Sequence, residues 1–315
     1  MQQKKDLKQL FDDYIYECQF SSRLRPATLK GYKEAFEHFS NLMPEIKYPD
    51  SLNASIMNEF FERLQVRKRI VGKNTEVVGV KDSTVATYYS KLNCFFEWLR
   101  RKDLLMENPL KHIKPPEPKY DDHRALRKDE VEKIISAATV HAISNLMRSR
   151  DLAIISLFMF CGLRRGELIG LQVRDINMDS RILTVRAEIS KSKRTRQIPI
   201  SPCLFVALED YFRVRKEKNY RTEYLIVSTT MDGPLTYDGF KHWVKRLIRL
   251  SGVKFHLHRF RHTFACALAN QSSSSIKIQK LMGHTDLRMT ERYLRSMGVE
   301  DMREDVNKLS LDKLM

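Results

Sequence analysis

The sequence predicts a mainly α-helical protein made of two domains. Three observations support this fold class: apolar residues recur at helical spacing along most of the chain, a proline-rich stretch interrupts that spacing after residue 108, and two short segments alternate as strands do. Four prolines in "ENPLKHIKPPEPKYDDHRAL" cannot continue a helix. We therefore expect a helical domain at 1–111, a linker at 112–124, and an α-rich domain with one small antiparallel sheet at 125–315.

The first domain is predicted to be a bundle of four amphipathic helices. The segments "LFDDYIYECQF", "ATLKGYKEAFEHFSNLM", "NASIMNEFFERLQVRKR" and "STVATYYSKLNCFFEWLRRKDLL" all carry apolar residues at i, i+3, i+4 and i+7. Pro26 marks the start of the second helix, and Ser83 is the expected N-cap of the fourth. The stretch "VGKNTEVVGVKD" between the last two helices is expected to be a polar connection.

The second domain is predicted to be helical around a small sheet. "LAIISLFMFCGL" at 152–163 is too short to span a bilayer and indicates a buried helix. "RILTVRAE" and "TRQIPIS" alternate as antiparallel strands joined by "ISKSKR", and "YLIVS" is a further short strand. "PCLFVALEDYFRVRKEK" is helical, Ser275 is an expected N-cap, and further helices are expected at 236–251, 258–270, 275–283, 286–297 and 299–312.

The charge balance indicates a polyanionic partner. Lys and Arg number 56 against 39 Asp and Glu, for a formal net charge of +17. Such an excess is typical of nucleic-acid binding, because each neutralised phosphate releases counterions. The five cysteines are scattered singly, and the N-terminus has no apolar signal core. We therefore expect neither a disulfide framework nor a zinc ribbon, no membrane association, and a cytoplasmic protein.

The stretch "HLHRFRHTFA" at 256–265 could hold either a metal or an anion. His258 and His262 have metal-ligand spacing on a helix, but Arg259 stands where a zinc peptidase needs Glu. Two guanidinium groups would repel a dication, so an anion is favoured and no metal or cofactor is expected. Arg261 follows His258 by one helical turn, so both side chains can reach one phosphate.

Three other motifs carry residues suited to the same anion, and each also has a plain structural interpretation. Arg164 in "CGLRRGELIGL" follows the buried helix and needs a partner, which Glu167 can supply as an i, i+3 ion pair. "ISKSKRTRQIPI" offers two lysines at a hairpin tip, which could also be a solvated turn. "LMGHTDLRMTERYLR" carries a histidine and a helical tyrosine that could equally be packing residues.

Together, "GLRRGEL", "KSKRTRQIPI", "HLHRFRHTFA" and "LMGHTDLRMTERYL" make the chain resemble the tyrosine recombinase (phage integrase) family over nearly its whole length. The resemblance implies a site-specific recombinase that cuts and rejoins DNA through a 3′-phosphotyrosyl intermediate, without metal or ATP. It assigns two phosphate-binding arginines, a general acid, two assisting histidines and a nucleophile. In that order these catalytic residues are Arg164 and Arg261, Lys191, His258 and His284, and Tyr293.

The lysine assignment leaves one alternative open. Lys191 is preferred because it lies eight residues before the proline of the "IPI" strand. Lys193 lies two residues further and would point the same way on a strand. Glu167 matches the acidic position that supports the first arginine in the family.

The resemblance also implies the partners. The first domain would be a core-binding (SAM-like) domain that clamps duplex DNA together with the catalytic domain, as in two-domain enzymes of the Xer, integron or transposon type. A homotetramer on paired recombination sites is expected, alone or with a second recombinase or accessory protein, with the tail after residue 298 packed into a neighbouring protomer. The basic residues expected to contact phosphates are Arg23, Arg25, Lys30, Lys33, Arg67, Lys68 and Arg69.

Two other functions, a topoisomerase and a non-cleaving DNA-binding protein, are alternatives to a recombinase. A type IB topoisomerase shares the chemistry, but the short chain and the amphipathic tail argue against it. A DNA-binding accessory protein or decayed homologue would have no need of Tyr293.

Overall fold

The computed structural model describes residues 5–72, 74–116, 125–271, 274–287 and 290 of the 315-residue chain. The chain divides into two compact units, Met1–Tyr120 and Asp121–Met315, and the division falls within the proline-rich stretch. The described residues are mainly helical with small antiparallel sheets, which confirms the predicted fold class. Within these residues no helix is both long enough and apolar enough to cross a membrane.

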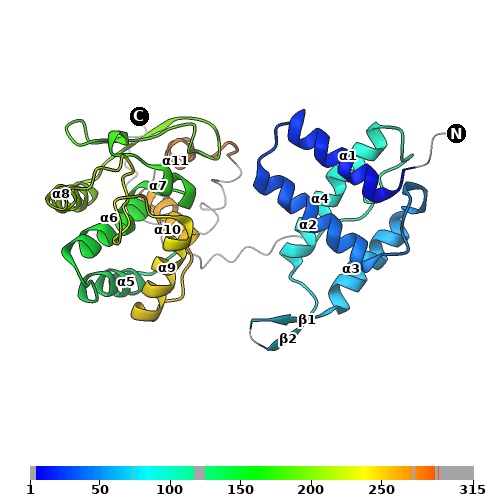
Figure 1. The fold of residues 1–315 in the computed structure, drawn as a ribbon, viewed down its shortest axis with the longest axis horizontal. Helices are drawn as coiled ribbons and strands as arrows, with labels where there is room; N and C mark the ends of the chain where they lie inside the picture. Colours follow the sequence, from blue (N-terminus) through cyan, green and yellow to red (C-terminus); the bar gives the residue numbers. More distant parts are fainter. Residues whose placement is uncertain (1–4, 73, 117–124, 272–273, 288–289, 291–315) are drawn as a thin grey trace, which may run out of the picture. The chain divides into compact units, whose positions relative to one another are not determined.

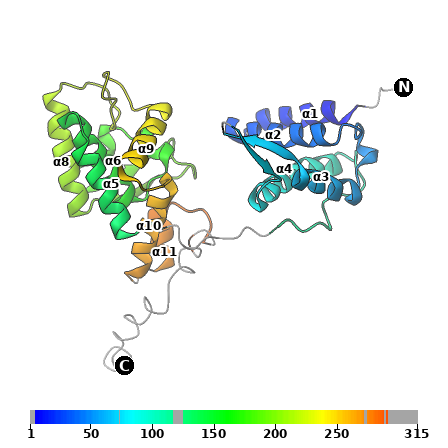
Figure 2. The same ribbon diagram turned by 90° about the horizontal axis from the view of Figure 1, so that it is seen from below.

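The first unit is built on four long helices that pack around an aromatic core (Figures 1 and 2). Phe11 stacks on Phe36 with ring centroids 4.0 Å apart, and Phe95 meets both rings edge-on at 5.1 and 5.5 Å. These three rings come from three different helices, so the apolar faces predicted from the spacing do meet. The helices are α1 (Leu7–Phe20), α2 (Pro26–Leu42), α3 (Ala54–Val66) and α4 (Asp82–Arg101), with a 3₁₀ turn η1 (Pro49–Ser51) before α3.

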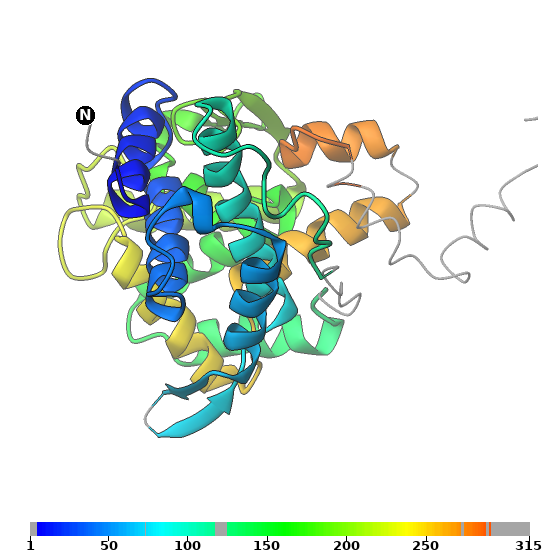
Figure 3. The ribbon, with the colours of Figure 1, turned by 90° about the vertical axis from the view of Figure 1, so that its right-hand side faces the viewer.

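The connection between α3 and α4, which the sequence indicated only as a polar segment, is a β-hairpin. Strands β1 (Lys68–Val71) and β2 (Thr75–Val78) pair antiparallel, with Lys68 opposite Val78. Valine and isoleucine favour extended backbone, and Gly72 supplies a left-handed turn residue at φ +68°. The hairpin projects from the end of α3 (Figure 3).

The second unit packs its helices around α6 (Asn145–Cys161). Ile154, Leu157 and Phe158 have no exposed surface, which confirms the buried helix predicted from the apolar run. The neighbours of α6 are α5 (Lys128–Val140), α8 (Pro202–Glu217) and α10 (Leu257–Asn270). Short α7 (Arg165–Gly170) and the 3₁₀ turn η2 (Val173–Asp175) follow α6, and α9 (Tyr237–Ser251) and α11 (Ser275–Met282) complete the described helices.

The predicted sheet is present and has three strands in the order β3-β4-β5. Strands β4 (Ile182–Val185) and β5 (Arg196–Pro199) pair antiparallel as expected, and the two-residue β3 (Ile176–Asn177) adds an edge. In contrast, "YLIVS" forms only isolated bridges, Gln172 to Tyr224 and Val227 to Pro234, so the prediction of a strand there was wrong.

Two predicted helix starts are displaced, the first by two residues and the second by one. The N-cap of α4 is at position 81 rather than at Ser83, because the helix already begins at Asp82. The side chain of Ser274, rather than that of Ser275, accepts a hydrogen bond from the backbone N–H of Lys277 and caps α11. The helices expected at 286–297 and 299–312 fall almost wholly outside the described residues.

Gly162, which ends α6, is expected to tolerate no side chain. Its φ is +55°, and a Cβ added there would lie 2.4 Å from Cδ1 of Phe264. Left-handed strain together with overpacking predicts that Gly162→Ala lowers the free energy of unfolding by about 2–5 kcal/mol. Gly252→Ala is the matched control, because Gly252 also ends a helix at positive φ but faces open space.

Urea unfolding of the two variants measures this difference. Strain alone predicts a loss of about 1–2 kcal/mol for Gly252→Ala. Equal losses for the two variants would show that contact with Phe264 has no effect on stability.

Candidate active site

Arg164 stands at the start of α7, directly after the turn that ends α6. Its backbone N–H donates to Oε2 of Glu167 at 2.9 Å, and its Nη1 donates to Oε1 at 2.9 Å. The Glu167 carboxylate therefore caps the helix and holds the guanidinium at once, as the i, i+3 spacing predicted. Nη2 of Arg164 also donates to the carbonyl oxygen of Gly283 at 3.3 Å.

The HxxR pair lies on the first turns of α10, and its two members differ in exposure. Arg261 is buried, and it donates to the carbonyl oxygens of Gly162 and Met282. His258, one turn earlier, is exposed. Desolvation by the surrounding protein, followed by the charges of His256, Arg261 and Arg164, lowers the pKa of His258 below its ordinary value, which favours the neutral imidazole.

Three of the predicted site residues line one hollow of about 670 Å³. They are Arg164, Lys191 and His258, which come from α7, the β4–β5 connection and α10. Arg165, another lining residue, places its guanidinium 4.9 Å from the ring centre of Tyr237. Cationic side chains therefore form part of the wall of the hollow, which suits an anion such as phosphate.

Lys191 and Lys193 differ in their position relative to this hollow. Both lie in a turn of the β4–β5 connection rather than on a strand, so the expectation that they point the same way does not hold. Lys191 borders the hollow, whereas Lys193 is not among its lining residues and has φ +53°.

His284 lies beside a second hollow, of about 500 Å³, between β5 and α11. Its backbone N–H donates to the carbonyl of Gln279 at 3.1 Å, and its Nδ1 lies 2.9 Å from Oγ1 of Thr290. The structure does not place His284 in the first hollow. The predicted nucleophile Tyr293 lies outside the described residues.

One residue of this region, Arg196, was not singled out from the sequence. It begins β5, faces inward, and donates to Glu167 through Nη1 at 3.1 Å and Nη2 at 2.8 Å. Its Nε donates to the carbonyl oxygen of Leu281 at 3.0 Å. The signal was present: in the alternating "RQIP" strand, Arg196 shares the inward face with Ile198, where a charge needs partners.

Three arginines therefore converge on the C-terminal end of α11, which lies beside α10 (Figures 1 and 3). The consecutive carbonyl oxygens of Leu281, Met282 and Gly283 accept from Arg196, Arg261 and Arg164 respectively. The last carbonyls of a helix have no partner within it and carry partial negative charge, so cations are favoured there. The end of α11 thereby fixes both predicted phosphate-binding arginines.

The described residues contain no group of three or more His, Cys, Asp or Glu side chains that could hold a metal ion. His258 and His262 are flanked instead by Arg259, whose Nη2 donates to Glu130 at 2.7 Å.

The chain is similar to known proteins over most of its length. The model of the phage integrase family matches residues 124–298. A tyrosine recombinase of Thermosipho africanus is 27% identical over 296 residues, which cover 91% of this chain and 93% of the relative. Tyrosine recombinase XerC of Bacillus subtilis is 25% identical over 299 residues, covering 93% and 92%.

Solved structures of lower identity share the fold. The Tn1549 transposon integrase in complex with a circular intermediate DNA superposes with a TM-score of 0.74 at 18% identity, covering 96% of this chain and 99% of that one. A lambda integrase dimer bound to a COC′ core site gives 0.68 at 19% identity, covering 91% and 95%. Because the family model spans more than half of the chain, and the relatives match it almost end to end, the chain belongs to the phage integrase family of tyrosine recombinases.

Proposed function

We infer that this chain is a site-specific DNA recombinase, an enzyme that cleaves DNA strands and rejoins them to new partners. The observation that carries this function is the convergence of Arg164, Lys191 and His258 on one hollow, with Arg261 buried beside it. The similarity of the chain to tyrosine recombinases supports the same activity. A topoisomerase, an accessory protein and a decayed homologue are not favoured.

We assign the phosphate of the scissile bond to the two arginines. In phosphoryl transfer, catalysis consists mainly of positioning and of stabilising charge on the non-bridging oxygens. A guanidinium presents its donors in a planar fork that matches phosphate, which suits Arg164 and Arg261 to this role. The imidazole of His258, whose neutral form is favoured, can accept a hydrogen bond or a proton, which an imidazolium cannot.

The remaining steps are assigned to Tyr293, His284 and Lys191. The Tyr293 hydroxyl attacks phosphorus, its proton passes to a histidine, and the bond from phosphorus to the 5′ oxygen breaks. Lys191 gives a proton to that leaving oxygen. The 3′-phosphotyrosyl bond keeps the energy of the cleaved bond, and the 5′ hydroxyl of the partner strand later displaces the tyrosine. No cofactor is required by this sequence of steps.

We assign duplex DNA to a basic face of the first unit that includes the β1–β2 hairpin. Nη1 of Arg67 lies 3.4 Å from Nδ1 of His38, whose ring is 5.4 Å from that of Tyr88. Burial raises the pKa of Tyr88, and the nearby charges of Arg67 and Arg69 oppose the rise. Arg67 and Arg69 therefore cluster with α2 and α4, where Lys30, Lys33 and Lys91 also lie. The similar integrases bind DNA in their solved structures.

Replacing Arg67 and Arg69 together by alanine is expected to weaken DNA binding and flatten its salt dependence. Each lost phosphate contact reduces the slope of log K against log salt by about 0.9, so the double variant loses about 1.8. Fluorescence anisotropy between 50 and 300 mM NaCl measures the slope.

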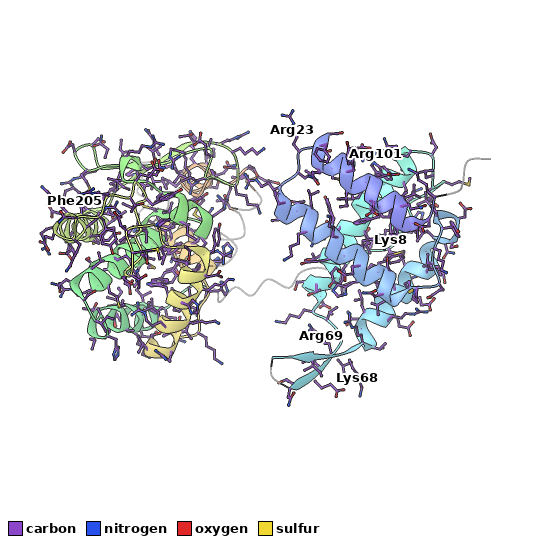
Figure 4. The ribbon with its side chains drawn as sticks, viewed as in Figure 1. Lys8, Arg23, Lys68, Arg69, Arg101 and Phe205 are labelled. Atoms are coloured by element: carbon purple, nitrogen blue, oxygen red, sulfur yellow. The ribbon has the colours of Figure 1, made fainter. Side chains whose placement is uncertain are left out.

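The matched control replaces Lys8 and Arg101, which carry the same charge on the same unit but lie away from the hairpin (Figure 4). The control should keep the wild-type slope. Equal slopes for both double variants would remove the hairpin from the DNA interface.

We further propose that the active assembly is a homotetramer on two paired sites in the cytoplasm, with or without a second recombinase. The amphipathic tail after residue 298 would join neighbouring protomers, and it lies outside the described residues. Analytical ultracentrifugation with and without DNA sites tests the stoichiometry: a complex of four chains and two duplexes is expected.

The function itself is tested by trapping the covalent intermediate. Purified protein is incubated in EDTA with nicked fragments of its own genomic neighbourhood, and the products are separated in SDS. An adduct that survives SDS is expected, and sequencing the trapped DNA locates the site. Absence of an adduct on every fragment, with DNA binding intact, would contradict the assignment as a self-sufficient recombinase.

A further inference from the structure

We propose that Arg196 is a positioning residue for strand cleavage, which holds Glu167 and the end of α11 so that Arg164 can present its guanidinium to the scissile phosphate. This inference rests on the proposed function and adds a residue to it. Arg196 does not line the hollow formed by Arg164, Lys191 and His258, so it acts through its neighbours.

The position of Arg196 is costly unless its charge is fully paired. It is 9% exposed, and its strand partner Val185 is fully buried. Burying an unpaired cation in such a place costs several kcal/mol, so the site must supply partners. It does: all three nitrogens of the guanidinium are used, two on Glu167 and one on the carbonyl of Leu281.

Close packing fixes the guanidinium in this place. A Cβ added to Gly283 would lie 2.9 Å from Nη1 of Arg196 and 3.1 Å from its Cδ. The backbone of the turn before His284 therefore rests on the Arg196 side chain, and only glycine allows this approach at φ +62°.

The effect on Arg164 follows from the sharing of one carboxylate. Glu167 is 1% exposed, and its two oxygens accept from Arg196 as well as from Arg164. Burial raises the pKa of Glu167, but the hydrogen bond and charge of Arg196, followed by Arg164, lower it below its ordinary value, so the group is ionised. Without Arg196, the carboxylate has Arg164 as its remaining cation and can engage it in bidentate fashion. That engagement draws the Arg164 guanidinium away from the hollow.

The test is single-turnover cleavage of a nicked recombination site with enzyme in excess. Arg196→Met should slow adduct formation about 100-fold, the effect of a small misplacement of a catalytic group, with unchanged affinity for uncleaved DNA. Arg196→Lys keeps the charge but loses the forked geometry of the guanidinium, so its cleavage rate should lie between those of the wild type and Arg196→Met. Glu167→Gln added to Arg196→Met should recover part of the rate, because the carboxamide no longer attracts Arg164 as an ion.

Arg215→Met is the matched control for buried arginine. Arg215 is 6% exposed and donates to the carbonyl oxygens of Tyr224 and Leu225, but no hydrogen bond joins it to Glu167 among the described residues. For an equal drop in melting temperature, Arg215→Met should retain cleavage near the wild-type rate. If it slows cleavage as much as Arg196→Met does, Arg196 is only structural and the inference is overturned.

A substrate with sulfur in place of the leaving 5′ oxygen separates the routes by which Arg196 could act. Such a leaving group departs without a proton, so it corrects defects in proton donation only. The Arg196→Met defect should persist on this substrate; full recovery would mean that Arg196 acts through Lys191 and would overturn the inference. If wild-type protein forms no adduct, the proposed function fails; if it does and Arg196→Met matches its rate, only this inference fails.

Discussion

Replacing Tyr293 by phenylalanine abolishes the SDS-stable adduct and leaves DNA affinity unchanged. The substitution removes one hydroxyl and keeps the aromatic ring, so it removes the proposed nucleophile with little change in side-chain volume. We expect the cleavage rate to fall by about 10⁴-fold or more, because the remaining site lacks a nucleophile to attack the phosphorus. Quantitative SDS gels on nicked DNA and anisotropy on intact DNA give the two readings.

The control for this change is another tyrosine of the same domain that stands away from the site. Tyr220 donates its hydroxyl hydrogen to the carbonyl of Ser228, and Tyr220→Phe should cleave normally. An adduct of normal yield in Tyr293→Phe would remove Tyr293 as the nucleophile and direct the search to the peptide recovered with the DNA.

Replacing Lys191 by alanine slows cleavage by about 10²–10⁴-fold, the usual contribution of a positioned general acid. The physical reason is the leaving alkoxide, which departs poorly unless it is protonated. On DNA with a 5′-sulfur leaving group, which departs as a thiolate without needing a proton, the variant should recover most of the wild-type rate. Single-turnover rates on the two substrates give the measurement.

Lys193→Ala serves as the comparison for Lys191, because it removes the same charge from the same turn. It borders no part of the hollow, so its rate should be near that of the wild type on both substrates. If instead Lys193→Ala shows the large loss and the sulfur recovery, the two lysines exchange their assigned roles.

Side-chain periodicity made the fold class predictable. The apolar run at 152–163 predicted a helix buried on all sides, and α6 is such a helix, at the centre of the second unit. The alternation in "RILTVRAE" and "TRQIPIS" predicted strands that pair, with Leu183 opposite Ile198. The pairing of Arg164 with Glu167 was predictable for the same reason, because residues three apart on a helix are neighbours.

Features that depend on backbone or on distant partners could not be predicted in this way. The β1–β2 hairpin buries little, so it leaves no clear pattern of apolar residues, and Ile70 is 74% exposed. The carbonyls of Gly283 and Met282 are each more than twenty positions from the arginine whose hydrogen bond they accept. Every residue has a backbone carbonyl, so the sequence does not indicate which carbonyl will serve as an acceptor. Likewise, adjacent serines at 274 and 275 offer equal caps, and only the helix geometry chooses between them.

The acceptors at the end of α11 have a consequence for how such an enzyme can diverge. The groups at this helix end that accept from the arginines are peptide carbonyls, so the side chains of Leu281 and Met282 take no part in these hydrogen bonds. Their positions can accept other residues of fitting volume while the arginines stay in place, whereas Gly283 cannot vary, since a Cβ there would press on Arg196. Because Met282 is fully buried, a library restricted to apolar residues at 281 and 282 should yield many active clones, whereas one randomised at 283 should return mostly glycine. Sequence drift around this candidate site is therefore expected at the helix end and not one residue later.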